Sequence, residues 1–200
     1  KNILELNFDF INRSKKNEFG ERLAIVLLDN IKPWVKQLSD QEKYFKEFET
    51  FIFKSLLNIF HKLEIDTILF KPKHWMDEYA KEGVFKFSNL KKKFQVYYFP
   101  DYFENLPIEY YLDTLKPKII VGNLSSALYY TKLLNSKIET YTYDDWFNEY
   151  TYKNFGEVYP DFEIIRTSFF QKYNYLYHDI NPKQLYFNSS NEIDKNFIKN

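Results

Sequence analysis

Two cations and an imidazole lie together in the segment Lys71-Pro72-Lys73-His74-Trp75, directly after a short apolar run. Lys73 and His74, held beside a rigid proline, could bind a phosphate group, and the imidazole could protonate a phosphate that departs. The same composition suits a solvated basic loop in which Trp75 packs against the histidine. From the segment alone the solvated surface loop is the preferred interpretation, and an anion site is the alternative.

A carboxylate stands at a predicted helix start in Leu106-Pro107-Ile108-Glu109, since proline suits the first turn of a helix. Held there, Glu109 could accept both hydroxyl groups of a ribose, a role that carboxylates have in other nucleotide sites. The helix dipole also favours a carboxylate in this turn when no ligand is present. From this segment alone the dipole explanation is preferred, and the ribose ligand is the alternative.

Groups that suit a phosphate recur in Gly122-Asn123-Leu124-Ser125-Ser126, between an apolar run and a predicted helix. Free backbone N–H groups at a helix start, with the hydroxyls of Ser125 and Ser126, make a ready anion site, and Asn123 beside them is a further candidate. Helix capping alone would explain one serine. The second serine therefore favours a ligand.

Short apolar runs alternate with helical patterns along the chain. The predicted strands are residues 23–28, 67–70, 94–99, 118–121 and 138–141. The predicted helices begin at the capping-box pattern of Ser39, near Pro107, at Ser126 and near Phe162. One face of the first helix should be buried, because its apolar residues recur at spacings of three and four: Phe45, Phe48, Ile52, Leu56 and Phe60.

Strands that alternate with helices predict an α/β fold, a Rossmann-like parallel sheet flanked by helices. In such sheets the ligand lies at the carboxyl ends of the strands. All three polar segments are predicted to meet at that edge. A basic loop, a ribose ligand and a phosphate site are together what a nucleoside monophosphate leaving group needs.

The bulk composition narrows the classes of function. The chain has 28 basic and 28 acidic residues, and this formal net charge of zero argues against duplex nucleic acid as a partner. It has no cysteine, which excludes disulfides, thiolate metal sites and a cysteine nucleophile. No apolar run approaches the roughly 20 residues that span a bilayer. The pair Asp144-Asp145 is interpreted as a helix start, not as a metal site.

The three segments resemble, in type and order, those of the carboxy-terminal donor domain of GT-B bacterial sialyltransferases. That family includes lipooligosaccharide sialyltransferases and capsular polysialyltransferases. Lys71-Pro72-Lys73-His74 looks like its histidine motif, Pro107-Ile108-Glu109 like its glutamate segment, and residues 119–128 like its serine motif. The resemblance covers residues 22 to 145. Trp75 stands where the family has a proline after the histidine.

The resemblance implies one half of a GT-B fold. Residues 1–20 would be a linker or an extra element, and residues 21–200 would form the domain that binds the nucleotide-sugar donor. The donor would be CMP-sialic acid, used in the synthesis of bacterial lipooligosaccharide or capsule.

The resemblance also implies a role for each candidate residue. Glu109 would bind the cytidine ribose, and Ser125 and Ser126 would bind the phosphate. His74 would contact that phosphate and act as the acid that assists the departure of CMP. No metal or other cofactor is implied, because the serines, the histidine and the helix dipole would neutralise the phosphate.

The second substrate would be a glycan acceptor, held by an amino-terminal domain that this chain lacks, so that the chain alone would not catalyse transfer. The family's general base matches no segment here. Asp29, after the first predicted strand, is a substitute, although an aspartate there also suits a turn. The expected location is the cytoplasm, or the periphery of the inner membrane.

Two alternatives remain from the sequence. The chain could belong to a GT-B enzyme that uses another nucleotide-linked sugar or polyol, because a ribose carboxylate and phosphate serines do not distinguish bases. It could instead be a non-catalytic interaction domain whose aromatic clusters, Tyr141 to Tyr152 and Tyr173 to Tyr177, bind a protein. Amphipathic packing also accounts for such residues.

Overall fold

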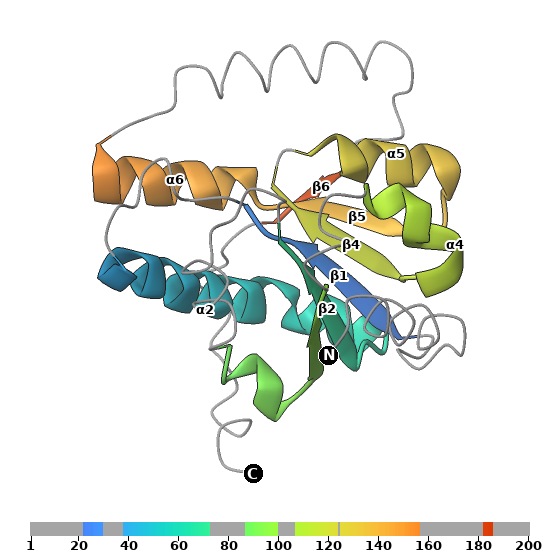
Figure 1. The fold of residues 1–200 in the computed structure, drawn as a ribbon, viewed down its shortest axis with the longest axis horizontal. Helices are drawn as coiled ribbons and strands as arrows, with labels where there is room; N and C mark the ends of the chain where they lie inside the picture. The colour runs from blue at the N-terminus through green and yellow to red at the C-terminus, as the bar shows by residue number, and fades with distance from the viewer. Residues whose placement is uncertain are drawn as a thin grey trace, which may run out of the picture.

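A computed structural model describes residues 22–29, 38–72, 87–99, 107–123, 125–156 and 182–185 of the chain (Figure 1). The predicted element at residues 1–20 and the predicted helix at 162–177 lie outside these residues. The described strands are β1 (Leu23–Leu27), β2 (Thr67–Lys71), β3 (Gln95–Tyr98), β4 (Ile119–Gly122), β5 (Glu139–Thr142) and β6 (Lys183–Gln184). The helices are α2 (Leu38–Lys62), α4 (Leu112–Leu115), α5 (Ser126–Leu134) and α6 (Asp144–Phe155), with the short 3-10 helices η1 (Leu90–Lys92) and η3 (Ile108–Tyr111).

All five described strand pairs are parallel, and the strands form one sheet in the order β3-β2-β1-β4-β5-β6. The chain thus winds from β1 outward in one direction and from β4 outward in the other. This is the order of the doubly wound Rossmann fold, in which a crevice opens where the direction reverses, between β1 and β4. The prediction of a Rossmann-like parallel sheet is confirmed.

The central strands are buried on both faces, which explains their continuous apolar sequence. In β1, Ala24 and Val26 point into one core cluster, while Leu23 and Ile25 point into another. All four are fully buried. The alternation follows from the two-residue period of a strand, and it divides the core into two layers.

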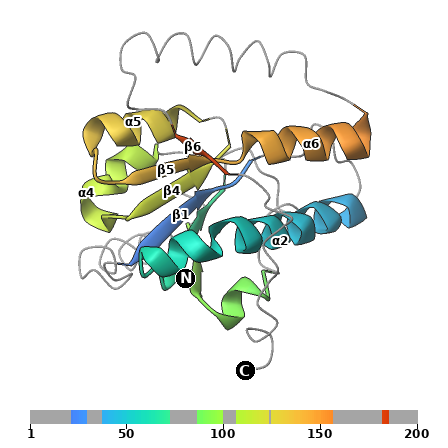
Figure 2. The ribbon, with the colours of Figure 1, turned by 180° about the vertical axis from the view of Figure 1, so that it is seen from behind.

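Helices cover both faces of the sheet (Figures 1 and 2). Side chains of α2, α6 and η1 belong to one core cluster, and those of η3, α4 and α5 belong to the other. The helix predicted from Pro107 to Leu115 forms as η3 followed directly by α4. The capping-box pattern predicted that Ser39 would precede the helix as its N-cap. Helix α2 instead begins at Leu38, so Ser39 lies within its first turn.

Helix α2 is much longer than the strands that it covers. Its 25 residues span about 37 Å at the rise of an α-helix, whereas a five-residue strand spans about 17 Å. The helix ends at Lys62, five residues before β2 begins, so its last turn lies near the amino ends of the strands. The excess length therefore belongs to the first part of α2, which projects beyond the carboxyl ends of the strands. Helix α6 lies beside this projecting part (Figures 1 and 2).

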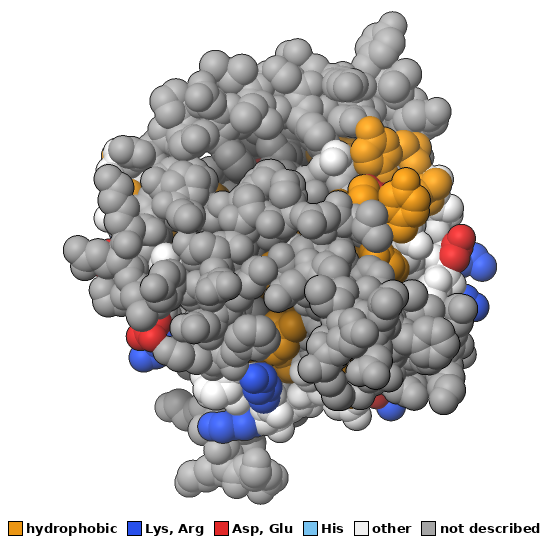
Figure 3. Space-filling model, in the orientation of Figure 1, with side chains coloured by type: hydrophobic (Ala, Val, Ile, Leu, Met, Phe, Trp, Pro, Cys, Tyr) orange, Lys and Arg blue, Asp and Glu red, His pale blue; other side chains and the backbone are white. Residues whose placement is uncertain are grey.

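An exposed apolar patch lies over α5 and η3 (Figure 3). It contains Tyr130, Leu133 and Leu134 on the outer face of α5 and Tyr110 on η3, of which Tyr110 is the most exposed at 73%. None of the helices among the described residues combines the length and apolarity that crossing a bilayer requires.

Strand β6 is only two residues long and is tied to β5 by side chains as well as by the backbone. Glu139 Oε2 accepts hydrogen bonds from Lys183 Nζ at 2.8 Å and from the Tyr141 hydroxyl at 2.7 Å. The hydrogen bonds from Lys183 and then Tyr141 lower the pKa of Glu139, and burial and Glu139 raise the pKa of Tyr141.

This contact predicts a pH dependence. A carboxylate with a lowered folded pKa stabilises the fold above its unfolded pKa and loses that contribution as the pH falls through the folded value. We expect Glu139→Gln to lower the free energy of unfolding at neutral pH by no more than about 1 kcal/mol, because the Lys183 partner is exposed to solvent. In acid the two proteins should unfold at the same urea concentration. A constant difference at all pH values would contradict this.

Candidate functional site

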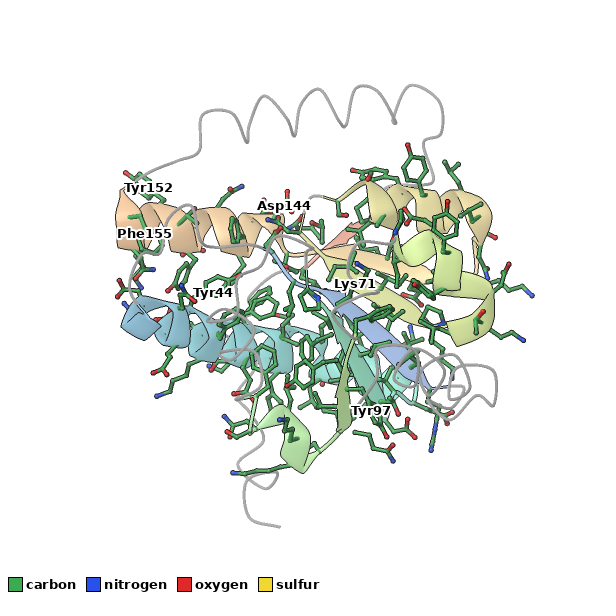
Figure 4. The ribbon with its side chains drawn as sticks, in the orientation of Figure 1. Tyr44, Lys71, Tyr97, Asp144, Tyr152 and Phe155 are labelled. Carbon is green, nitrogen blue, oxygen red and sulfur yellow. The ribbon has the colours of Figure 1, made fainter. Side chains whose placement is uncertain are left out.

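Polar side chains gather at the carboxyl ends of the central strands. Asp29 follows β1, Lys71 ends β2, Asn123 follows β4, and Asp144 begins the helix after β5. Each is buried, with at most 9% of the residue exposed. Figure 4 labels Lys71 and Asp144 in this region. Because these strands are parallel, the four residues belong to the same edge of the sheet. Buried polar groups in such number at one edge are typical of a binding site.

Tyr143 closes one side of the crevice between β1 and β4. Tyr143 follows β5, and its hydroxyl donates a hydrogen bond to the carbonyl oxygen of Leu27, at the end of β1, at 2.8 Å. Burial raises the pKa of Tyr143 well above its ordinary value, and the charge of Asp29 raises it further. The tyrosine thus stays neutral and fills the side of the crevice that faces α2.

The closed side has a consequence for the ligand. Dinucleotide-binding Rossmann domains place a pyrophosphate against a glycine-rich turn after the first strand. Here no glycine lies between Gly20 and Gly83, and Tyr143 covers the exit of β1. A dinucleotide site of that type is therefore absent from the described residues around β1. The other candidates predicted from the sequence, Glu109, Ser125 and Ser126, lie in η3 and at the start of α5, on the opposite side of the sheet.

Ser125 caps helix α5, as one of the two interpretations of the serine pair predicted. Its backbone is extended, with φ −136° and ψ 132°, and its Oγ accepts a hydrogen bond from the N–H of Ala127 at 3.3 Å. The hydroxyl of the exposed Ser126 makes no hydrogen bond with the described residues. One serine thus holds the helix start, while the other is open to a ligand at the positive end of the helix dipole.

Gly122 lets β4 pass close to its neighbour just before this helix. A Cβ atom at this position would lie 3.2 Å from Leu27 Cδ1 and 3.6 Å from Leu128 Cδ2. Such a Cβ would crowd the Leu27 side chain of β1, whereas its distance to Leu128 of α5 is an ordinary contact. The glycine therefore permits the close packing of the end of β4 against Leu27.

Glu109 lies in η3, which contacts α5. Its carboxylate oxygen Oε2 is buried and accepts no hydrogen bond from the described residues, and the same holds for Oδ1 of Asn123. Buried acceptors without a donor are rare in folded proteins. A ligand that carries hydroxyl or amino groups would satisfy them.

Lys73 and His74 lie outside the described residues, so their predicted roles stay predictions. Strand β2, which leads to them, ends at Lys71 at the same sheet edge as the other candidates. Lys71 is one of the two cations of the predicted anion site, although no ligand contact was assigned to it. Its Nζ lies 5.7 Å from the centre of the ring of Phe99, which follows β3.

Tyr143 was missed as a site residue, because a single tyrosine after a short strand gives no sequence signal. The interpretation of Asp144 as a helix start is confirmed, since α6 begins there, and the Thr142 hydroxyl donates to its Oδ1 at 3.1 Å. Within the described ranges, no three histidine, aspartate or glutamate side chains are grouped so as to hold a metal ion.

Comparison with known proteins gives no assignment for this site. No protein-family model matches the chain, and no curated protein matches it. The geometry of the sheet edge and the chemistry of its side chains are thus what a functional interpretation can use.

Proposed function

We propose that this sheet edge binds the nucleoside monophosphate part of an activated sugar. The chain would be the donor-binding domain of a sialyltransferase-like glycosyltransferase that uses CMP-sialic acid in bacterial surface-glycan synthesis. The observation that carries the proposal is the contact of η3 with α5. Because of this contact, Glu109, whose Oε2 has no hydrogen-bond donor among the described residues, lies in the element next to the helix that Ser125 caps.

The two elements suit the two halves of such a ligand. The ribose has a pair of adjacent hydroxyl groups, and a buried carboxylate is a strong acceptor for them. The phosphate would meet the free N–H groups and the Ser126 hydroxyl at the start of α5, where the dipole favours negative charge. Oδ1 of Asn123, buried beside the helix start, would accept from a further ligand donor.

In the proposed reaction the bond between the sugar and the phosphate breaks, CMP leaves, and an acceptor hydroxyl forms the new glycosidic bond. The negative charge that develops on the departing phosphate would be stabilised by the α5 dipole and Ser126. By the resemblance of its segment, His74 would donate a proton to the phosphate, with Lys73 beside it. The acceptor hydroxyl loses its proton to a base, for which Asp29 at the β1 exit is the candidate in this chain.

Isothermal titration of the chain with CMP, UMP and UDP tests the proposal. We expect CMP to bind and the double variant Ser125→Ala/Ser126→Ala to bind it at least about tenfold more weakly, since hydrogen bonds to a charged phosphate are lost. The matched control is Ser136→Ala, an exposed serine beyond the other end of α5, which should leave the affinity unchanged.

The other results have defined meanings. Equal or tighter binding of UDP would move the proposal to an enzyme with a uridine-linked donor. If none of the three nucleotides binds, or if the serine variant binds CMP as well as the unmodified chain, the site is not a nucleotide site. Circular dichroism should show α5 intact in the variant, because the Ser125 cap is removed as well.

One observation favours the interaction-domain alternative, namely the exposed apolar patch of Tyr110, Tyr130, Leu133 and Leu134 (Figure 3). Large exposed apolar patches often mark protein contacts. An interaction domain would keep its partner in the Ser125→Ala/Ser126→Ala variant and would show no affinity for CMP.

A further inference from the structure

A second hollow lies away from the crevice, between the projecting part of α2 and helix α6. Its volume is about 480 Å³, which is within the range of small-molecule sites. The two helices run antiparallel there. Lys43 of α2 donates a hydrogen bond to Asn154 near the end of α6 at 3.0 Å, and Phe51 of α2 stacks on Trp146 near its start. We call this hollow the α2–α6 groove.

The inner end of the α2–α6 groove, close to the sheet, is aromatic. Trp146 stacks on the buried Phe51 with ring centres 4.7 Å apart and an interplanar angle of 15°. Tyr150, one turn further along α6, lies 5.4 Å from Trp146. Figure 4 shows Tyr44 between the same two helices, where its ring packs 5.2 Å from that of Tyr150. The aromatic surface is thus fixed from behind by the core.

The rest of the groove is lined by charged side chains, and the positive and negative ones lie at different positions along it. The antiparallel arrangement puts Lys43, Lys46 and Lys153 at the outer end, while Glu47 and Glu149 lie between these lysines and the aromatic end. Apart from the contact of Lys43 with Asn154, these five charged groups form no ion pair or hydrogen bond with the described residues. Their charges are therefore available to a ligand.

This order of groups favours one kind of ligand. A pyranose ring has an apolar C–H face that buries area against an aromatic ring. Its hydroxyl groups donate to carboxylates. An acidic substituent is attracted by clustered ammonium groups. The distance along α6 from Trp146 to Lys153 is about 10 Å, so that a ligand with a sugar at one end and a carboxylate at the other would need more than one ring.

We propose that the α2–α6 groove binds a short acidic oligosaccharide, independently of the nucleotide site at the sheet edge. A sugar ring lies on Trp146, hydroxyl groups meet Glu47 and Glu149, and a carboxylate at the outer end meets Lys46 and Lys153. Nucleic acid fits less well, because the two glutamates would repel consecutive phosphates. An acidic peptide lacks the ring face and hydroxyls, and it serves as the competitor in the test.

The test uses a linear trimer of sialic acid as the probe, with neutral maltotriose for comparison. Binding is followed through the indole N–H signal of Trp146 in the ¹⁵N–¹H spectrum, assigned with Trp146→Phe. The trimer should shift this signal and bind at least about tenfold more tightly than maltotriose. Lys46→Glu/Lys153→Glu should weaken trimer binding by about tenfold or more. The charge-matched control Lys92→Glu/Lys137→Glu reverses two exposed lysines that do not line the groove, and it should bind the trimer normally.

Three results would overturn the proposal: no binding of the trimer, equal binding by the groove variant, or equal competition by a short glutamate peptide. CMP titration of the same samples separates this inference from the nucleotide site. If the trimer binds and CMP does not, the groove stands and the proposed function fails. If CMP binds and the trimer does not, only the groove inference fails.

Discussion

Phe48→Ala is expected to lower the free energy of unfolding by about 3–5 kcal/mol, the range for truncation of a buried aromatic residue. The Phe48 side chain is fully buried in the centre of α2. Its ring centre lies 5.9 Å from Tyr44, 5.1 Å from Tyr143, 5.5 Å from Trp146 and 6.3 Å from Phe87. These rings come from three segments, namely α2 itself, the start of α6 and the residues before η1, so the cavity could not close without moving several elements.

Urea unfolding followed by circular dichroism measures this loss. Phe53→Ala is the control on the same helix, because Phe53 is only partly buried and packs at the margin of the cluster. We expect it to cost clearly less than Phe48→Ala. Equal costs at the two positions would mean that the aromatic cluster is not the principal support of α2.

The aromatic cluster connects the stability of the fold to both proposed sites. Phe48 supports Tyr143, which closes one side of the crevice, and it also supports Trp146, which forms the inner end of the α2–α6 groove. The conservative change Phe48→Leu should therefore loosen the packing of both Tyr143 and Trp146 while the chain stays folded. A packed core of this kind has discrete arrangements and transmits small changes.

The fold class could be predicted because its signals are local. Five predicted strands and the helices between them alternate as the structure has them, and the predicted strand ends differ from the observed ones by at most one residue. The predicted apolar face of the first helix is confirmed residue by residue, since all five of its members are buried: Phe45, Phe48, Ile52, Leu56 and Phe60. Periodicity reports which residues face a core, whatever that core is.

The features that could not be predicted depend on contacts between distant segments. Strand β6 is two residues long and is defined by its pairing with β5, so it has no pattern of its own. The hydrogen bond from Tyr143 to Leu27 spans 116 residues. The antiparallel pairing of α2 with α6 likewise joins segments that carry no mutual signal in the sequence. These contacts shape the crevice and the groove. For this reason the sequence could predict at which edge of the sheet the candidate residues lie, but not the contacts that surround them.

The candidate site residues differ in what the structure adds. Ser125 acts as a helix cap, which the sequence allowed, and Ser126 is exposed beside it. Glu109 lies in η3, an element that contacts α5. The third segment, with Lys73 and His74, lies outside the described residues. The roles of all of them in binding remain proposals that the nucleotide titrations address.

Glu49 holds η1 to helix α2 through a buried carboxylate. The residue is 4% exposed. Its Oε1 accepts hydrogen bonds from the backbone N–H groups of Asn89 at 2.8 Å and Leu90 at 2.9 Å, and its Oε2 accepts from the Asn89 side chain at 3.4 Å. The carboxylate thus satisfies the start of η1, where backbone N–H groups have no partner within the helix. It does so from a position 40 residues earlier in the chain.

Glu49→Ala is expected to lower the free energy of unfolding by about 3 kcal/mol, since hydrogen bonds to a charged group are lost and buried N–H groups are left unpaired. Glu49→Gln should cost much less, because one amide oxygen can replace Oε1 as the acceptor for both backbone groups. Urea unfolding measures the free energy of unfolding of each variant. Hydrogen exchange of the Asn89 and Leu90 amides shows whether the destabilisation is at the start of η1. If the glutamine variant is as unstable as the alanine variant, the charge itself stabilises η1, and the geometric explanation is wrong. Neither variant should alter CMP affinity, because η1 belongs to the core layer opposite α5 and η3, so these variants separate the stability of the domain from its proposed nucleotide site.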